Sequence, residues 1–231
     1  GKADAFLAKV SPDGETVWVK QFGTPAIDLA TRVWVQGDTL YAAGTAGDAL
    51  FGAHVGHHAT CSCEIENLWL AAFDLDGTEL WSTQFGVASH LTVTGLVMDD
   101  DDNAYLIGMV WESMPGSTHK GGQDMFIIKF DSAGTRVWSQ NIGRAGSEVA
   151  HRLLLGSDGT LYMIGQVKDQ WDAPLTEGDG GDIVVVAVDP DDGSELWAQQ
   201  YGSTRYDRPY DATIDPETDT IYITGFTSGD F

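Results

Sequence analysis

One short segment concentrates the side chains that bind transition metals. Residues 54–63 contain three histidines and both cysteines of the chain, namely His54, His57, His58, Cys61 and Cys63. Imidazole and thiolate are donors that zinc and copper ions prefer. The spacing matches no zinc-finger pattern, and two cysteines one residue apart are poorly placed around one tetrahedral ion. Three interpretations stay open: a zinc or copper site, a disulfide between Cys61 and Cys63 or to a group outside the chain, and an inert loop.

Two acidic segments are candidates for calcium. Residues 99–103 (Asp-Asp-Asp-Asp-Asn) and 189–193 (Asp-Pro-Asp-Asp-Gly) carry the hard oxygen donors that Ca²⁺ requires. Neither segment supplies the downstream bidentate glutamate of an EF-hand loop. Both coincide with turns that recur along the chain, so turn formation is the competing interpretation.

The remaining side chains form no recognisable catalytic motif. His90, His119 and His151 are far apart in the sequence, and there is no Gly-x-Ser-x-Gly elbow or phosphate-binding glycine loop. Carboxylates are too numerous for two to be singled out as a glycosidase pair. The sequence therefore predicts a protein that is not an enzyme.

These segments belong to a four-fold internal repeat, which must position them. Four tryptophans lie 63, 57 and 59 residues apart, and four tyrosines each precede a glycine by three residues. The repeated residues are Trp18, Trp81, Trp138 and Trp197, Tyr41, Tyr105, Tyr162 and Tyr222, and Gly44, Gly108, Gly165 and Gly225. Two blocks that keep the same phase four times indicate four equivalent structural units.

Each unit is predicted to be a four-stranded antiparallel sheet. Short apolar runs such as Ala5–Val10 end in Gly-containing turns, and no stretch shows a helical period. A single sheet cannot bury two apolar faces, so neighbouring units must stack, as the blades of a β-propeller do. The predicted boundaries are 1–51, 52–114, 115–175 and 176–231, and the repeated aromatics are expected to pack between blades. The second unit begins with an insertion, 52–66, because Gly44 and Asn67 are 23 residues apart while the equivalent separations are 16 and 17.

The repeats resemble the bacterial SBBP propeller repeat family. In the first unit the resemblance rests on Asp4-Ala5-Phe6, Trp18, Gln21-Phe22-Gly23, Tyr41 and Gly44. In the fourth unit it rests on Asp182, Trp197, Tyr201-Gly202, Asp207, Tyr222, Gly225 and 227–231. The second unit departs from the pattern, with Asn67 in place of aspartate and an altered segment around His90. The resemblance implies a secreted or cell-surface protein, or a periplasmic one, without a defined catalytic activity, and a propeller with more than four blades.

A second resemblance covers less of the chain. Asp189, Gly193 and Trp197 are spaced as in the repeats of pyrroloquinoline-quinone enzymes and of similar outer-membrane assembly scaffolds, and residues 74–81 match less well. It implies a quinone-dependent enzyme or an assembly module as alternatives to a binding scaffold.

Charge narrows the range of partners. With 12 Lys+Arg against 35 Asp+Glu, the net charge is -23 and the pI is about 4.2. Such a surface repels nucleic acids and anionic lipid headgroups. No apolar run approaches the roughly 20 residues of a membrane-spanning helix. The chain has no initiating Met or signal peptide, so we expect it to begin after processing or inside a longer protein.

We therefore expect an acidic, non-catalytic extracellular or cell-surface propeller that acts as a scaffold. Its expected partner is a protein or glycan, a larger assembly, or further repeats of the same chain. The alternatives are an enzyme that uses the propeller channel, quinone-dependent or hydrolytic, and a metal-binding assembly module.

Overall fold

The computed structural model describes residues 1–54, 66–168, 171 and 181–230. Within them, sixteen strands form three four-stranded and two two-stranded antiparallel sheets, and no residue is helical. Consequently, no helix in the described part of the chain is long and apolar enough to cross a membrane. The predictions of an all-β fold and of four-stranded antiparallel sheets are confirmed.

The sheets follow one another along the chain. The first contains β1 (Ala5–Val10) and β2 (Thr16–Phe22). The second contains β3 (Asp28–Gln36), β4 (Thr39–Ala46), β5 (Asn67–Asp74) and β6 (Glu79–Phe85). The third contains β7 (Leu91–Met98), β8 (Ala104–Val110), β9 (Asp124–Phe130) and β10 (Arg136–Ile142). The fourth contains β11 (Glu148–Leu155), β12 (Leu161–Val167), β13 (Asp182–Val188) and β14 (Glu195–Tyr201), and the last β15 (Asp207–Ile214) and β16 (Ile221–Thr227).

The expectation that each sequence repeat forms its own sheet is wrong. Each four-stranded sheet joins the second hairpin of one repeat to the first hairpin of the next, because β4 pairs with β5, β8 with β9 and β12 with β13. The boundaries 1–51, 52–114, 115–175 and 176–231 are therefore half a sheet out of phase with the sheets. The physical reason is burial: β5, β9 and β13 are apolar on both faces and need a neighbouring strand on each side.

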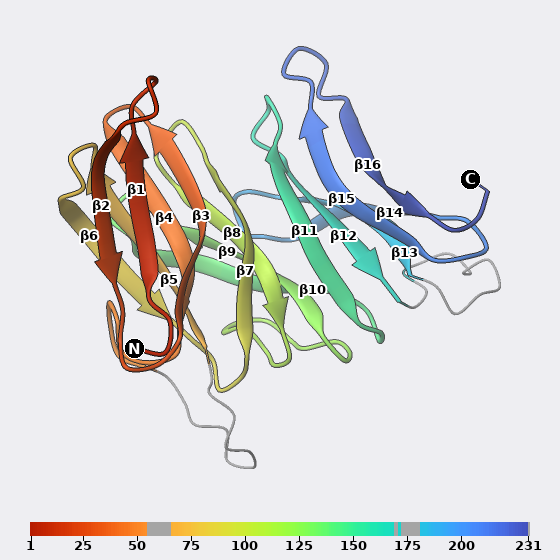
Figure 1. The fold of residues 1–231 in the computed structure, drawn as a ribbon. Coiled ribbons are helices and arrows are strands. Elements are labelled where there is room, and N and C mark those ends of the chain that lie inside the picture. Colours follow the sequence, from red (N-terminus) through yellow and green to blue (C-terminus); the bar gives the residue numbers. More distant parts are fainter. Residues whose placement is uncertain (55–65, 169–170, 172–180, 231) are drawn as a thin grey trace.

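The sheets stack along an arc (Figure 1). Strands β3, β7, β11 and β15 lie on its inner side, where each contacts the next. The two-stranded hairpins β1–β2 and β15–β16 lie at opposite ends of the arc, and the described strands form no closed ring.

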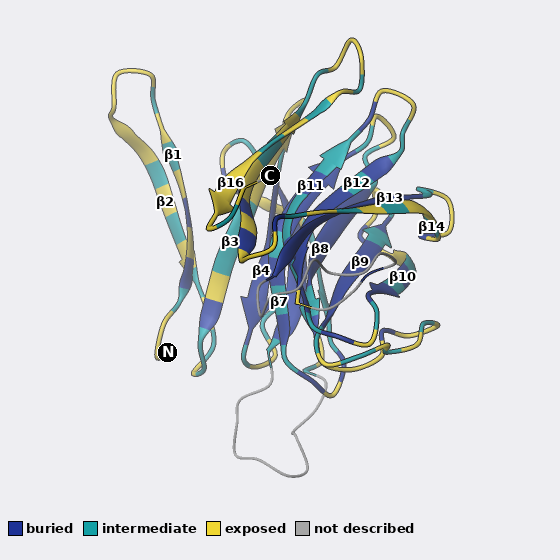
Figure 2. Cartoon of the chain, turned by 90° about the vertical axis from the view of Figure 1, so that its right-hand side faces the viewer, coloured by how far each residue is buried: buried dark blue, intermediate teal, exposed yellow. Residues whose placement is uncertain are grey.

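Apolar side chains from facing sheets fill the spaces between them. One buried cluster joins the sheet β3–β6 to the sheet β7–β10, and a second joins β7–β10 to β11–β14. The middle strands of these sheets are almost wholly buried, whereas the terminal hairpins are largely exposed (Figure 2).

The repeated aromatics form a ladder on each complete sheet. A tyrosine on the second strand and a tryptophan on the fourth flank one residue of the strand between them, with ring centroids about 6 Å apart. The ladders are Tyr41–Ala72–Trp81, Tyr105–Lys129–Trp138 and Tyr162–Ala187–Trp197. The tryptophan also reaches the next sheet, since Trp18 Nε1 donates to Leu75 O at 3.1 Å and Trp138 Nε1 to Pro190 O at 3.2 Å. The predicted packing role is confirmed for six of the eight aromatics, whereas Trp197 and Tyr222 are 45% and 60% exposed. The tyrosine–tryptophan contact itself lies within a sheet.

The repeated glycines of the second block lie opposite β-bulges. In each inner strand one extra residue interrupts the register: Thr31, Thr94, His151 or Tyr210. A Cβ added at Gly44, Gly108 or Gly225 would lie 1.8, 1.6 or 2.2 Å from a backbone carbonyl oxygen of the bulged strand. The glycine is therefore required by close backbone approach.

The predicted hairpin turns are also present. Gly14, Gly77, Gly134 and Gly193 all have φ between 77° and 85°, the left-handed region that glycine adopts without strain. In the second hairpin of each unit, one residue, Gly37, Asp102, Gly159 or Asp219, has positive φ.

Candidate functional site

The candidate site is a cleft of about 560 Å³ formed by turns of neighbouring sheets. It is lined by the β7–β8, β11–β12, β13–β14 and β15–β16 turns. Six aspartates line it, namely Asp99, Asp100, Asp101, Asp158, Asp191 and Asp219, together with a single cationic residue, Lys129. The fold thus brings together both acidic segments that the sequence singled out, which are some 90 residues apart (189 against 99).

Backbone donors hold several of these carboxylates in place. Asp99 Oδ1 accepts hydrogen bonds from the backbone N–H groups of Asp101 at 3.0 Å and Asn103 at 2.8 Å. Its Oδ2 accepts from Tyr105 OH at 3.0 Å and from Asn103 Nδ2 at 2.8 Å. Burial acts to raise the pKa of Asp99, but these hydrogen bonds outweigh it and the pKa lies below its usual value. Asp99 is therefore ionised at neutral pH and fixed in orientation.

Two further aspartates of the cleft show the same pattern. Asp158 Oδ1 accepts from Thr160 N at 2.9 Å, and Asp219 accepts from Ser157 N at 2.9 Å. Beside Asp99, the Lys129 ammonium lies 5.1 Å from the Tyr105 ring and donates to Pro190 O. The one cation is thus engaged by carbonyl and ring, and the open side of the cleft is anionic.

The calcium prediction gains no support from this geometry. No group of three or more His, Cys, Asp or Glu side chains in the described ranges is arranged to hold a metal ion. Instead, Asp189 Oδ1 accepts from Asp191 N and Asp192 Oδ1 from Ser194 N, both at 2.8 Å, as turn-forming aspartates do.

The histidine and cysteine segment is only partly described. His54 is half-buried. His57, His58, Cys61 and Cys63 lie outside the described residues, so the zinc, copper and disulfide interpretations stay predictions.

The other three histidines occupy separate places. His90 packs edge-on against Trp111, with ring centroids 6.2 Å apart, and His119 Nε2 lies 3.1 Å from Gly122 O. His151 is the bulged residue of inner strand β11, and its Nε2 is buried without a hydrogen-bond partner. Burial, and then the charges of Arg208 and Arg152, lower its pKa to about 4.

His151 should give the chain an acid-sensitive stability. Its ordinary pKa is 6.5, so between pH 6.5 and about 4 the unfolded chain binds a proton that the folded chain does not. Stability is therefore retained above pH 6.5 and lost as the pH falls towards 4. For a half-buried side chain we expect a loss of roughly 2 kcal/mol.

The variant His151→Thr tests this expectation, because Thr31 and Thr94 occupy the same bulge position. Denaturant unfolding at pH 7.5 and 4.5 should show a smaller loss of stability in the variant than in the natural chain. The variant His119→Thr, at a histidine away from the inner strands, should keep the natural pH dependence. Equal losses for His151→Thr and the natural chain would contradict the assignment.

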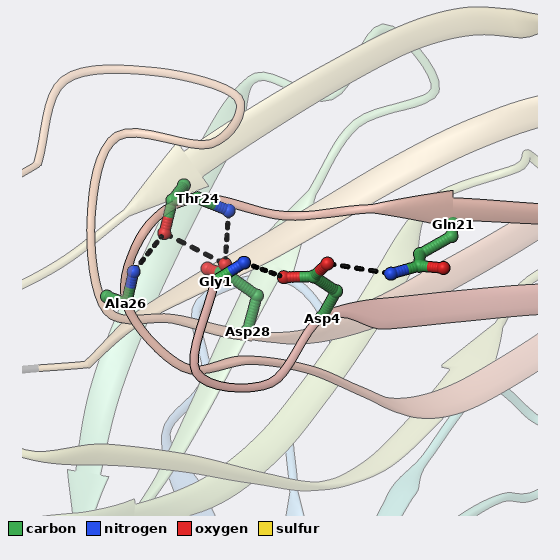
Figure 3. Close-up of polar contacts among 6 residues, drawn as sticks. All are labelled: Gly1, Asp4, Gln21, Thr24, Ala26 and Asp28. Carbon is green, nitrogen blue, oxygen red and sulfur yellow. Dashed lines mark hydrogen bonds and ion pairs between the residues drawn. The ribbon is translucent and has the colours of Figure 1, made fainter.

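Asp4 and Asp182, which carry part of the sequence resemblance, have a structural role that the sequence did not reveal, and so have Asp28 and Asp124. Asp4 accepts from Gln21 Nε2 at 2.7 Å and pairs with the N-terminal ammonium at 2.9 Å, and Asp28 accepts from the Thr24 hydroxyl at 2.8 Å (Figure 3). Equivalent bonds join Asp124 to Asn141 at 2.9 Å and Asp182 to Gln200 at 2.7 Å. Each aspartate–amide pair joins the start of the first strand of a hairpin to the end of the second strand. The signal available in the sequence was an amide side chain 17 or 18 residues after Asp4, Asp124 and Asp182.

No protein-family model matches the chain, and no curated protein matches it significantly. The resemblance to SBBP repeats, and the location that it implies, therefore stay predictions. A functional proposal for this chain therefore has to rest on the acidic cleft and on the stacking of the sheets.

Proposed function

We propose that the chain is a non-catalytic scaffold of the β-propeller type whose acidic cleft binds a cationic segment of a protein partner. The propeller arrangement is supported by the equivalent antiparallel sheets and by the contacts between successive inner strands. The sequence analysis predicts a protein or glycan as the partner. We infer the positive charge of that partner from the aspartates that line the cleft.

One observation carries the proposed function. Carboxylates from turns of different sheets converge on one concave surface, and the protein's own backbone holds several of them in fixed orientations. Preorganised charges of one sign in a cleft focus the field and attract an oppositely charged ligand. Lysine and arginine side chains can reach such carboxylates while their backbone remains outside.

A peptide of eight lysines is a suitable probe, measured by titration calorimetry at low and at moderate salt. The variant Asp100→Asn, Asp158→Asn, Asp191→Asn removes three charges and retains the side-chain oxygens that accept hydrogen bonds. We expect the dissociation constant to rise roughly tenfold or more.

The control removes three charges from turns outside the cleft, with Asp13→Asn, Glu15→Gln and Asp76→Asn. This control should change the affinity far less than the cleft variant. If both triple variants weaken binding equally, the attraction is due to net charge alone and the cleft is not the binding site.

A further inference from the structure

Arg32 is a half-buried arginine to which the described residues offer no carboxylate. It lies on inner strand β3, one residue after the bulged Thr31. Its Nε donates to Thr94 O at 2.6 Å and its Nη1 to Thr31 O, and within the described ranges it forms no ion pair. Arginines that leave water are normally paired with an acid, and in this chain Asp and Glu outnumber Lys and Arg by 35 to 12. The missing carboxylate therefore needs an explanation.

Arg152 shows how the equivalent position is satisfied elsewhere. It follows the bulged His151 on inner strand β11, as Arg32 follows Thr31 on β3. Its Nη1 donates to His151 O, which is the bond that Arg32 makes to Thr31 O. Its Nε, however, pairs with the carboxylate of Asp211 on the next inner strand, β15. The two guanidiniums therefore differ in one respect, since only Arg152 faces an acid.

The difference arises in the strand that each arginine faces. Gly95 occupies on β7 the position that Asp211 occupies on β15, because each follows the bulged residue of its strand. Strands β3, β4, β7 and β8 contain a single acidic residue, Asp28, at the start of β3. An aspartate at position 95 would not fit, since a Cβ there would lie 2.7 Å from the Ile107 side chain. The packing of β7 therefore leaves the Arg32 charge to a group from outside the chain.

We propose that Arg32 binds the carboxylate or phosphate group of a small anionic ligand beside Gly95, on the inner side of the arc. The ligand oxygens take the place at Arg32 that the Asp211 carboxylate takes at Arg152. A guanidinium has five N–H donors, and backbone carbonyls accept from two of those of Arg32. The others are available for the paired hydrogen bonds that carboxylates and phosphates accept from arginine.

The local charge favours an anion although the protein as a whole is acidic. Burial, and then the charge of Arg152, lower the pKa of Arg32, so the two guanidiniums are close enough to repel each other. His151 has a pKa of about 4 and is neutral at pH 7, so it neither adds to this charge nor offsets it. An anion beside Arg32 relieves the repulsion. The net charge of -23 repels large polyanions, which restricts the ligand to a small molecule.

The proposed site lies within the array of complete sheets. Strands β3, β7 and β11 are the inner strands of the three four-stranded sheets, and each contacts the next (Figure 1). Arg32 donates from β3 to β7, and Thr31 Oγ1 does the same to Val93 O at 3.0 Å. The position of the guanidinium is therefore fixed by contacts between neighbouring sheets. The site is separate from the acidic cleft, which is formed by turns, and does not depend on its function.

NMR titration with succinate, and separately with inorganic phosphate, tests the binding at an ionic strength kept constant with sodium chloride. We expect the Arg32 Nε–H and Gly95 N–H signals to shift and saturate, with a dissociation constant of roughly 1 mM or lower. The probe that binds more tightly identifies the ligand as a carboxylate or a phosphate. If neither probe shifts these two signals, the proposal is wrong.

Arg32→Gln removes the guanidinium and should raise the dissociation constant at least roughly tenfold, as followed at the Gly95 N–H signal. The matched control is Arg205→Gln, which removes the same charge from an exposed arginine outside the inner strands. This control should bind the probe like the natural chain. Equal weakening in both variants would show that the probe responds to net charge alone, and would overturn the assignment to Arg32.

Asp211→Asn tests the site without changing Arg32. The Asp211 side chain is 61% exposed, and asparagine keeps the Oδ1 that accepts from Ala212 N at 2.9 Å, so the fold should be unaffected. Removing the charge that Arg152 faces makes the wall more positive, and the dissociation constant should fall roughly threefold. Asp13→Asn, in the exposed β1–β2 turn, should leave it unchanged. Binding that stays the same or weakens in Asp211→Asn would contradict the proposal.

Discussion

Replacing Gly108 with alanine is expected to destabilise the protein by about 3 kcal/mol or more, lowering Tm by roughly 10 °C or preventing folding. The added Cβ would lie 1.6 Å from Thr92 O and 2.7 Å from the Phe126 ring. The carbonyl belongs to the bulged strand β7, which is buried between two sheets. Neither the strand nor the ring can move away without opening the core.

Gly165→Ala is the matched comparison, since Gly165 occupies the same position in the next unit. Its first contact would be the flexible Met125 Sδ at 2.5 Å, and the nearest carbonyl, Val149 O, is 2.9 Å away. We expect a cost of about 1 kcal/mol. Denaturant unfolding of the two variants measures the difference, and similar costs would refute the role assigned to close backbone approach.

Trp69→Ala should cost about 4 kcal/mol in unfolding free energy. The Trp69 side chain is fully buried, and its ring lies 5.5 Å from Phe22 and 5.4 Å from Phe51. Its Nε1 donates to Thr45 O at 3.2 Å. Alanine leaves a cavity between the first two sheets and removes contacts that join β2 to β5.

Two controls separate size from position. Trp69→Phe, which copies Phe126 at the equivalent position, should cost about half as much because most of the volume is retained. Phe6→Ala, at the equivalent position of the terminal hairpin, should cost less than about 0.5 kcal/mol in dilute solution because that side chain is exposed. If Phe6→Ala lowered the unfolding free energy in dilute solution as much as Trp69→Ala, the Phe6 side chain would be buried and not exposed.

The strand order and turns were readable from sequence because they depend on local physics. Short apolar runs and glycines at positive-φ turn positions report on neighbours within one hairpin, and the recurrence of Trp18 as Trp81 marks the same strand in the next repeat. The β-bulge escaped sequence analysis, because Thr31 or His151 looks like any strand residue until the opposite glycine is seen.

By itself, the sequence determined that this chain is an all-β array of four repeating units with an acidic surface. Tertiary structure decided which hairpins share a sheet. It also gathered Asp99, Asp158 and Asp191 into one cleft. The reason is that strand pairing and turn convergence depend on contacts between residues about 20 to 100 positions apart, and a local pattern of residue types carries no information about them.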